Sequence, residues 1–182
     1  ILGIDPGLGI CGFGLIEALS KIDAKMLDFG VITTTMHAPL PSRLKELYES
    51  LQEVFRETKP DVVSVEKLFF SKNITTGIAV AEARGLVLLV AEQEGLPVFE
   101  YTPNEIKKTL TGYGSAGKPQ IQEMVRVHLG LEKKPRPDDA ADALAAAITC
   151  SFLYEQGRGE EQEFSNSRGR LTKKHKCDTI KD

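Results

Sequence analysis

The sequence predicts an α/β protein with a five-stranded mixed sheet flanked by helices. Three strand-like segments open the chain with only hairpin-length breaks between them, which is typical of an antiparallel meander. Helix-like and strand-like segments then alternate, which is typical of parallel crossovers. With 182 residues and no long polar linker, the chain fits a single domain with one sizeable core.

The meander strands are expected at residues 1–5, 11–17 and 25–34. Residues 61–67, DVVSVEK, form a β-branched run without polar alternation, which suits a strand covered on both faces. Residues 97–101, PVFEY, follow a glycine stop and complete the sheet.

Helices are expected between and after these later strands. Residues 41–58 carry apolar side chains at helical spacing, with Pro41 near the start and Pro60 just past the end. Four further helices are predicted, at residues 74–94, 103–110, 118–129 and 138–153. Residues 154–182 are polar and rich in both charge signs, so we expect a mostly disordered tail after a folded domain of residues 1–153.

The bulk composition restricts the function classes. A formal net charge of -3 means that a nucleic-acid partner must be met by locally clustered Lys and Arg. The three cysteines and three histidines are scattered without ligand spacing, which indicates reduced thiols in a cytosolic protein and no imidazole-based metal site. No uncharged apolar stretch is long enough to span a bilayer, so we expect a cytoplasmic protein without a membrane partner.

Two of the predicted strands end on a carboxylate, Asp5 and Glu66. Taken alone, Asp5 before Pro6 and Gly7 is most simply a turn residue that accepts backbone hydrogen bonds, and Glu66 could lean into solvent. If the two strands are parallel neighbours, however, their carboxyl ends bring both side chains to the edge where open α/β sheets bind ligands.

Two more carboxylates, Asp139 and Asp142, lie three residues apart on an alanine-rich helix and therefore project from one face. Asp139 also fits a first-turn acid that complements the helix dipole. Asp142 lies deeper in the apolar helix, where its charge is disfavoured unless a cation compensates it.

A helix laid across the sheet edge would bring all four carboxylates into one small space. Such a cluster needs counter-charge, and hard divalent cations with oxygen ligands supply it. The sequence therefore predicts a site for a pair of Mg²⁺ or Mn²⁺ ions about 4 Å apart, which activate a water and stabilise the leaving oxygen in phosphodiester cleavage.

Several motifs together resemble those of RuvC-type Holliday junction resolvases. The resemblance runs from the start of the chain to about Phe152, and its motifs are GIDPGLGICGFG, VSVEKLFFSKN, EARG, GYGSAGKPQIQEMV and DDAADALAAAIT. It implies a ribonuclease H-like fold, a homodimer, Mg²⁺ dependence and symmetric nicking of four-way DNA junctions. It also implies work alongside a branch-migration motor.

The resemblance assigns roles to individual residues. By motif, Asp5, Glu66, Asp139 and Asp142 are the catalytic carboxylates and the ligands of two Mg²⁺ ions, for which Mn²⁺ can substitute. Asp138 stands one place before the acidic pair of the family and is interpreted as a neighbour of the ligands.

The segment KLFFSKN, residues 67–73, follows the Glu66 strand and offers two aromatics beside two lysines. One interpretation is that Phe69 and Phe70 both fill the core. The other, which we favour, is that Phe69 stacks on an unpaired base, as in single-strand binders, and that Lys72 contacts DNA.

Lys107 and Lys118 flank a glycine-rich loop and could neutralise backbone phosphates near the metal site. For any single lysine a solvated charged face is about as plausible, and the resemblance favours the phosphate role. A basic cluster in the tail, residues 168–176, either adds non-specific DNA affinity or serves as a solubilising extension.

Residues 86–91 are apolar on every face of their predicted helix, which a helix on one side of a sheet does not require. Either a neighbouring helix covers the outer face, or a two-fold interface repeats the helix against itself. A symmetric dimer would present two sites to a junction that is itself roughly two-fold.

The leading hypothesis is a metal-dependent, structure-selective endonuclease that resolves Holliday junctions in recombination and repair. An actin-like or sugar-kinase-like phosphotransferase also opens with an acid followed by glycine, but it needs two such domains and this chain is too short. A non-cleaving junction-binding protein and a ribonuclease H-like nuclease acting on another nucleic acid, such as an RNA–DNA hybrid, are the remaining alternatives.

Overall fold

The structure is a computed structural model that describes residues 1–20, 23–68 and 74–154. The sheet order is β3-β2-β1-β4-β5, with β1 antiparallel to β2 and parallel to β4. The strands of this sheet are β1 (Leu2–Asp5), β2 (Ile10–Ala18), β3 (Ala24–Thr33), β4 (Val63–Glu66) and β5 (Val98–Tyr101).

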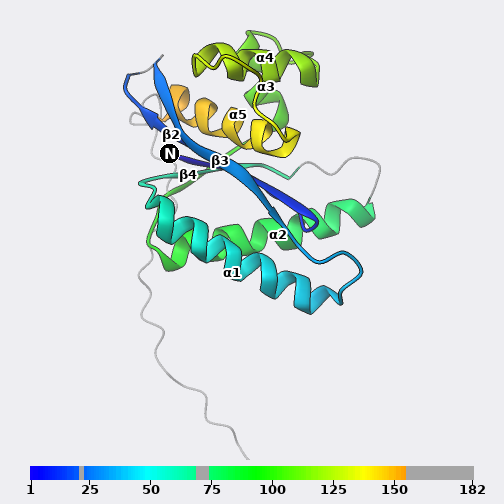
Figure 1. Cartoon of the computed structure of the whole chain (residues 1–182). Helices are drawn as coiled ribbons and strands as arrows, with labels where there is room; N and C mark the ends of the chain where they lie inside the picture. The colour runs from blue at the N-terminus through cyan, green and yellow to red at the C-terminus, as the bar shows by residue number, and fades with distance from the viewer. Residues whose placement is uncertain (21–22, 69–73, 155–182) are drawn as a thin grey trace, which may run out of the picture.

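Helices cover both faces of the sheet (Figure 1). One face carries α1 (Leu40–Thr58) and α2 (Ile74–Gln93), and the other carries α3 (Pro103–Thr111), α4 (Lys118–His128) and α5 (Asp138–Leu153). Each helical layer encloses its own apolar core against the sheet. The mixed five-stranded sheet predicted from the sequence is confirmed, and the predicted elements match the observed ones to within a few residues.

Side chains of the central strand β1 alternate between the two layers, as the pleat of a strand requires. Leu2 and Ile4 are fully buried in the core beneath α1 and α2. Gly3 and Asp5 therefore face the other layer, where the Cβ position of Gly3 would lie 2.0 Å from the carbonyl oxygen of Ala143 in α5. The catalytic candidate Asp5 thus points toward α5.

Glycines let α5 lie directly on the sheet. A Cβ atom on Gly12 would lie 2.1 Å from the carbonyl oxygen of Asp139, and one on Gly14 would lie 2.6 Å from the Leu144 side chain. Both distances are far shorter than any ordinary contact, so a side chain at either position would push the helix away. The glycine-rich start of the chain therefore sets how closely α5 approaches.

The segment that follows β5 positions two lysines. Thr102 caps α3, since its hydroxyl accepts from the Glu105 backbone N–H at 3.2 Å and the Glu105 carboxylate accepts from the Thr102 N–H at 2.7 Å. This capping box begins α3 directly after the strand and fixes Lys107 one turn further on. Gly117 then precedes Lys118, the first residue of α4.

The sequence also led to expectations about the cysteines, membrane-spanning helices and the C-terminal tail. Cys11 and Cys150 are buried free thiols, as expected. In the part of the chain that the structure describes, no helix has the length and apolar character needed to cross a membrane. The predicted tail lies outside the described residues apart from Tyr154.

Candidate active site

The parallel pairing of β1 and β4 brings Asp5 and Glu66 to the same edge of the sheet. Ile4 is in register with Val65, so the next residues along the two strands are neighbours. The hydroxyl of Ser64 donates to the carbonyl oxygen of Ala146 in α5 at 2.7 Å. Because side chains alternate along a strand, Glu66 shares the face of Ser64 and points toward α5 as well.

Helix α5 contributes the other two carboxylates. Asp5 pairs with Gly12 across the β1–β2 ladder, and the Asp139 backbone lies directly over Gly12. Asp139 is thereby placed beside Asp5, and Asp142 follows about one helical turn later on the same face. The four predicted carboxylates come from three distant parts of the sequence and meet at one edge of the sheet.

A cavity of about 260 Å³ opens at this edge. Its lining residues come from β4, α3, α4 and α5, and they are Glu66, Pro103, Ile106, Lys107, Lys118, Ile121, Asp142 and Ala145. Acidic and basic side chains therefore share one concave surface, which suits a ligand with both anionic and cationic groups.

The carboxylates carry more negative charge than their surroundings compensate. Burial raises the pKa of Asp5 from 3.8 to about 8, and repulsion from the other three carboxylates adds to this rise. Burial also raises the pKa of Glu66, with repulsion from Asp142 as the next cause. Lys118 lowers both values, but it does not offset these effects.

Lys118 forms ion pairs with two acidic residues of α5. Its Nζ lies 2.9 Å from Oδ2 of Asp142 and 3.7 Å from Oδ2 of Asp138. Asp138 also accepts a hydrogen bond from Nη1 of Arg136 at 2.7 Å. Burial nevertheless raises the pKa of Asp142, so one partially exposed lysine is insufficient counter-charge for this aspartate.

Among the described residues, no group of three or more His, Cys, Asp or Glu side chains is already arranged to hold a metal ion. One physical reason is visible: Asp142 faces Lys118, and the carboxylates repel one another. The donor set still fits a hard divalent cation, because it consists of partly buried carboxylate oxygens whose mutual repulsion such an ion would relieve.

The structure locates most of the residues selected from the sequence. Lys107 and Lys118 both line the cavity, next to Glu66 and Asp142. Phe69 and Lys72, the expected base-stacking and DNA-contacting residues, lie outside the described residues.

Sequence reasoning missed two contributors to the site. One is the set of glycines at positions 3, 12 and 14, which lie on two neighbouring strands and face α5; the alternate spacing of Gly12 and Gly14 along one strand was the available signal. The other is the pairing of Lys118 with Asp142, which joins helices that no local spacing relates.

Comparison with known proteins decides the family. The model of the family described as crossover junction endodeoxyribonuclease RuvC matches residues 1–150. The chain belongs to the RuvC family. A RuvC crossover junction endodeoxyribonuclease of Desulfitobacterium hafniense is 52% identical over 148 residues, which cover 81% of this chain and 89% of the relative. The corresponding protein of Brevibacillus brevis is 49% identical over 149 residues, covering 82% and 89%.

Solved structures agree with the family assignment. The structure of T. thermophilus RuvC in complex with Holliday junction substrate matches with a TM-score of 0.81 at 36% identity, covering 86% of this chain and 94% of that one. A yeast mitochondrial Holliday junction resolvase matches with a TM-score of 0.62 at 12% identity, covering 87% and 82%, and shows the fold alone. The ribonuclease H-like fold of RuvC proteins is thereby confirmed, and RuvC membership implies a divalent metal.

Proposed function

We propose that this RuvC-family endodeoxyribonuclease resolves four-way DNA junctions by hydrolysis at the carboxylate edge of its sheet. Asp5, Glu66, Asp139 and Asp142 are its proposed metal ligands. The observation that carries the proposal is the convergence of these four side chains, whose repulsion helps to raise the pKa of Asp5 to about 8. A protein keeps such an unfavourable cluster where a ligand makes use of it.

Two bound Mg²⁺ ions, or Mn²⁺ in their place, would activate the attacking water and stabilise the leaving oxygen. The chain itself supplies a rigid frame for these ligands. Asp5 and Glu66 are fixed at the ends of paired central strands, and α5 is held against the same strands by backbone contact. Asp5 has to lose its proton before it can act as a ligand.

Lys107 and Lys118 line the same cavity and are proposed to hold DNA phosphates there. A phosphate and Asp142 would both attract the Lys118 ammonium, so the lysine can turn from one anion to the other as the strand enters. The complex of the T. thermophilus relative with a Holliday junction supports four-way DNA as the substrate. Phe69 as base stacker and Lys72 as DNA contact remain part of the proposal.

The outer face of α2 is the proposed homodimer interface. Neighbouring helix α1 covers the inner face, where Val87 and Val90 are fully buried. Ile78 is 53% exposed and Leu89 is 46% exposed, and nothing lies within 4 Å of a Cβ built on Gly85 between them. This open apolar stripe with a flat centre suits a two-fold contact of the helix with itself.

The remaining assignments follow from the proposed substrate. The reaction is proposed to take place in the cytoplasm, alongside a branch-migration motor, as the family resemblance implies, and the bacterial origin of the relatives supports this assignment. Residues 154–182 are proposed to be an extension that leaves the nuclease domain of residues 1–153 intact.

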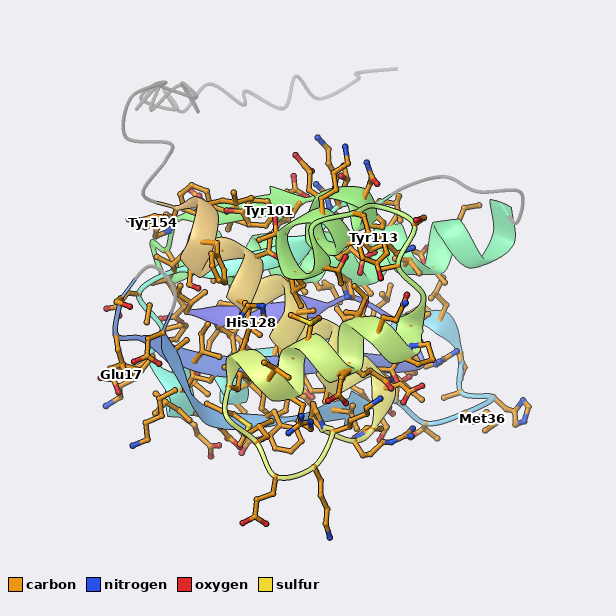
Figure 2. The ribbon with its side chains drawn as sticks, turned by 90° about the horizontal axis from the view of Figure 1, so that it is seen from above. Glu17, Met36, Tyr101, Tyr113, His128 and Tyr154 are labelled. Carbon is orange, nitrogen blue, oxygen red and sulfur yellow. The ribbon has the colours of Figure 1, made fainter. Side chains whose placement is uncertain are left out.

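Nicking of a synthetic four-way junction tests the proposal. With Mg²⁺ the protein should cut two opposed strands symmetrically, and with a chelator it should cut none. Glu66→Gln and Asp142→Asn should abolish nicking while junction binding survives, because phosphate contacts do not need the metal ligands. Glu17→Gln, an exposed carboxylate at the opposite end of the sheet, is the matched control (Figure 2).

The same assay separates the alternative functions. A protein that binds the junction without Mg²⁺-dependent nicking would be a scaffold. Preferential cleavage of an RNA–DNA hybrid, offered in competition with duplex and junction, would make it a ribonuclease H-like enzyme of different specificity.

Light scattering tests the dimer. Leu89→Glu places a charge in the apolar stripe of α2 and should convert a dimer to a monomer. Val127→Glu makes the same change on α4, at a side chain of similar exposure, and should leave the dimer intact. A wild-type protein that is monomeric at micromolar concentration would contradict the interface.

A further inference from the structure

Arg43 lies on the opposite side of the catalytic edge from the two cavity lysines. It belongs to the first turn of α1, in the helical layer across the sheet from Lys107 and Lys118. Figure 2 shows Met36, in the loop that leads into α1, and Tyr113, in the loop between α3 and α4, toward the same end of the sheet. Arg43 approaches this end beside Gly9, and Lys107 and Lys118 approach it from the other layer, where they line the cavity with Glu66.

A hydrogen-bond chain fixes the Arg43 side chain against the loop that follows Asp5. The Nε–H of Arg43 donates to the hydroxyl of buried Thr34 at 3.0 Å, and this hydroxyl donates to the carbonyl oxygen of Leu8 at 2.6 Å. A Cβ built on Gly9 would lie 3.5 Å from Nη2 of Arg43, so the guanidinium rests over the turn between β1 and β2.

The terminal nitrogens of Arg43 have no anionic partner among the described residues. No carboxylate lies within ion-pair distance, and the nearest candidate by helical spacing, Glu46, instead accepts a hydrogen bond from the Thr35 N–H at 2.7 Å. Arg43 is also not one of the charges that act on Asp5, which are the other carboxylates and Lys118. It is therefore not a counter-ion of Asp5.

Arg43 does not stabilise helix α1 either. A cation in the first turn of a helix opposes the helix dipole, and the first turn of α1 contains no acid to offset it. A half-buried guanidinium that is fixed through Nε and keeps its outer N–H groups free is the geometry that recognises a phosphate by two parallel hydrogen bonds.

We infer that Arg43 binds a backbone phosphate of the DNA strand, one or two nucleotides from the position of cleavage. Gly12 pairs with Asp5, and Ile10, the first residue of β2, lies two residues before Gly12, which is about 7 Å at the rise of a strand. Thr34, which holds Arg43, bonds through its N–H to the adjacent Gly9 carbonyl at 3.2 Å. Arg43 is thus a binding residue beside the reacting phosphate, and this inference rests on the proposed nuclease function.

Junction affinity in a salt series, measured in a chelator by fluorescence anisotropy, tests the inference. Arg43→Met should weaken binding about tenfold and reduce the slope of log K against log salt concentration by about one, as expected for one lost phosphate contact. Arg43→Lys should keep the slope and lose part of the affinity, because a lysine keeps the charge without the two-pronged geometry. Arg56→Met, at the other end of α1, is the control and should change neither quantity.

Two further measurements distinguish binding from structural support. The enzyme concentration that gives half of the maximal single-turnover nicking rate should rise about tenfold in Arg43→Met, a larger change than that in the maximal rate itself, because a phosphate contact acts mainly on binding. Thr34→Val, which removes the hydroxyl that holds the guanidinium, should lower affinity with an unchanged salt slope.

An unchanged salt slope in Arg43→Met would overturn the inference. So would a fall in its single-turnover rate without any loss of affinity. A wild-type protein that does not nick junctions at all would instead refute the proposed function. If Arg43→Met does not fold, Arg43→Lys and Thr34→Val decide, and wild-type affinity in both would reject the phosphate contact.

Discussion

Replacing Asp5 by Asn should stabilise the metal-free protein while it destroys the enzyme. Asp5 is crowded by three other carboxylates and partly shielded from water, which raises its pKa from 3.8 to about 8. Asn has nearly the same shape and carries no charge. The substitution therefore removes repulsion at the centre of the cluster and leaves the packing of α5 in place.

The sign of the effect follows from proton linkage. Between pH 3.8 and about 8 the folded protein binds the Asp5 proton more tightly than the unfolded chain does, so its stability falls as pH rises through this window. The full difference between the two pKa values of Asp5, 3.8 unfolded and about 8 folded, corresponds to about 5–6 kcal/mol at about 1.4 kcal/mol per pKa unit. Because water still reaches part of the site, we expect a gain of about 2 kcal/mol for Asp5→Asn at pH 8, or about 4–8 °C in Tm.

Thermal unfolding at pH 5 and pH 8, with a chelator and with Mg²⁺, checks this reasoning. In chelator, the advantage of Asp5→Asn over wild type should be larger at pH 8 than at pH 5. Mg²⁺ should raise the Tm of wild type at pH 8 and leave Asp5→Asn almost unchanged. Glu17→Gln, an exposed carboxylate far from the site, should gain nothing at either pH. A lower Tm for Asp5→Asn than for wild type at pH 8 would refute the idea of uncompensated repulsion.

Three further outcomes follow from the same geometry. Gly12→Ala should cost about 2–3 kcal/mol of unfolding free energy and most of the nicking activity, because its Cβ would meet the backbone of α5. Gly85→Ala, made in the monomeric Leu89→Glu background so that no partner helix lies over it, should gain up to about 1 kcal/mol in chemical denaturation. Lys118→Met should lower Tm in chelator, because Asp142 loses its counter-charge, and Mg²⁺ should restore most of the loss. The Mg²⁺ concentration for half-maximal nicking should rise as pH falls below 8, since the Asp5 proton competes with the metal; a requirement independent of pH between 6 and 8 would contradict this.

Much of the fold could be predicted because it depends on local periodicity. Strand runs, helical spacing and the positions of Pro and Gly set the order of the elements, and the β1–β4 pairing expected from that order is present. The meeting of Asp5 and Glu66 followed from the same rule, since parallel neighbours end at one edge. The carboxylate edge was therefore accessible from the sequence.

Other features depend on how distant segments approach each other. The Lys118–Asp142 ion pair depends on the placement of α4 against α5, which no periodicity specifies. The Arg43 side chain likewise depends on Thr34, whose hydroxyl donates to the carbonyl oxygen of Leu8 in the distant β1–β2 turn. Contacts of this kind can be recognised only once the three-dimensional structure is known.

Two opposing interactions act on α5 at the site. Repulsion among Asp5, Asp139 and Asp142 pushes the helix away from the sheet. The close packing of α5 on the glycines of β1 and β2 holds it against the sheet. The packing extends over more of the helix than the repulsion does. The contact at Gly14 and the hydrogen bond from Ser64 to Ala146 both lie beyond the charged turn of α5. The first turns of α5 therefore carry the electrostatic strain while the rest of the helix anchors it. A divalent cation acts where the repulsion is concentrated, so metal binding should order the acidic end of α5 without moving its buried half.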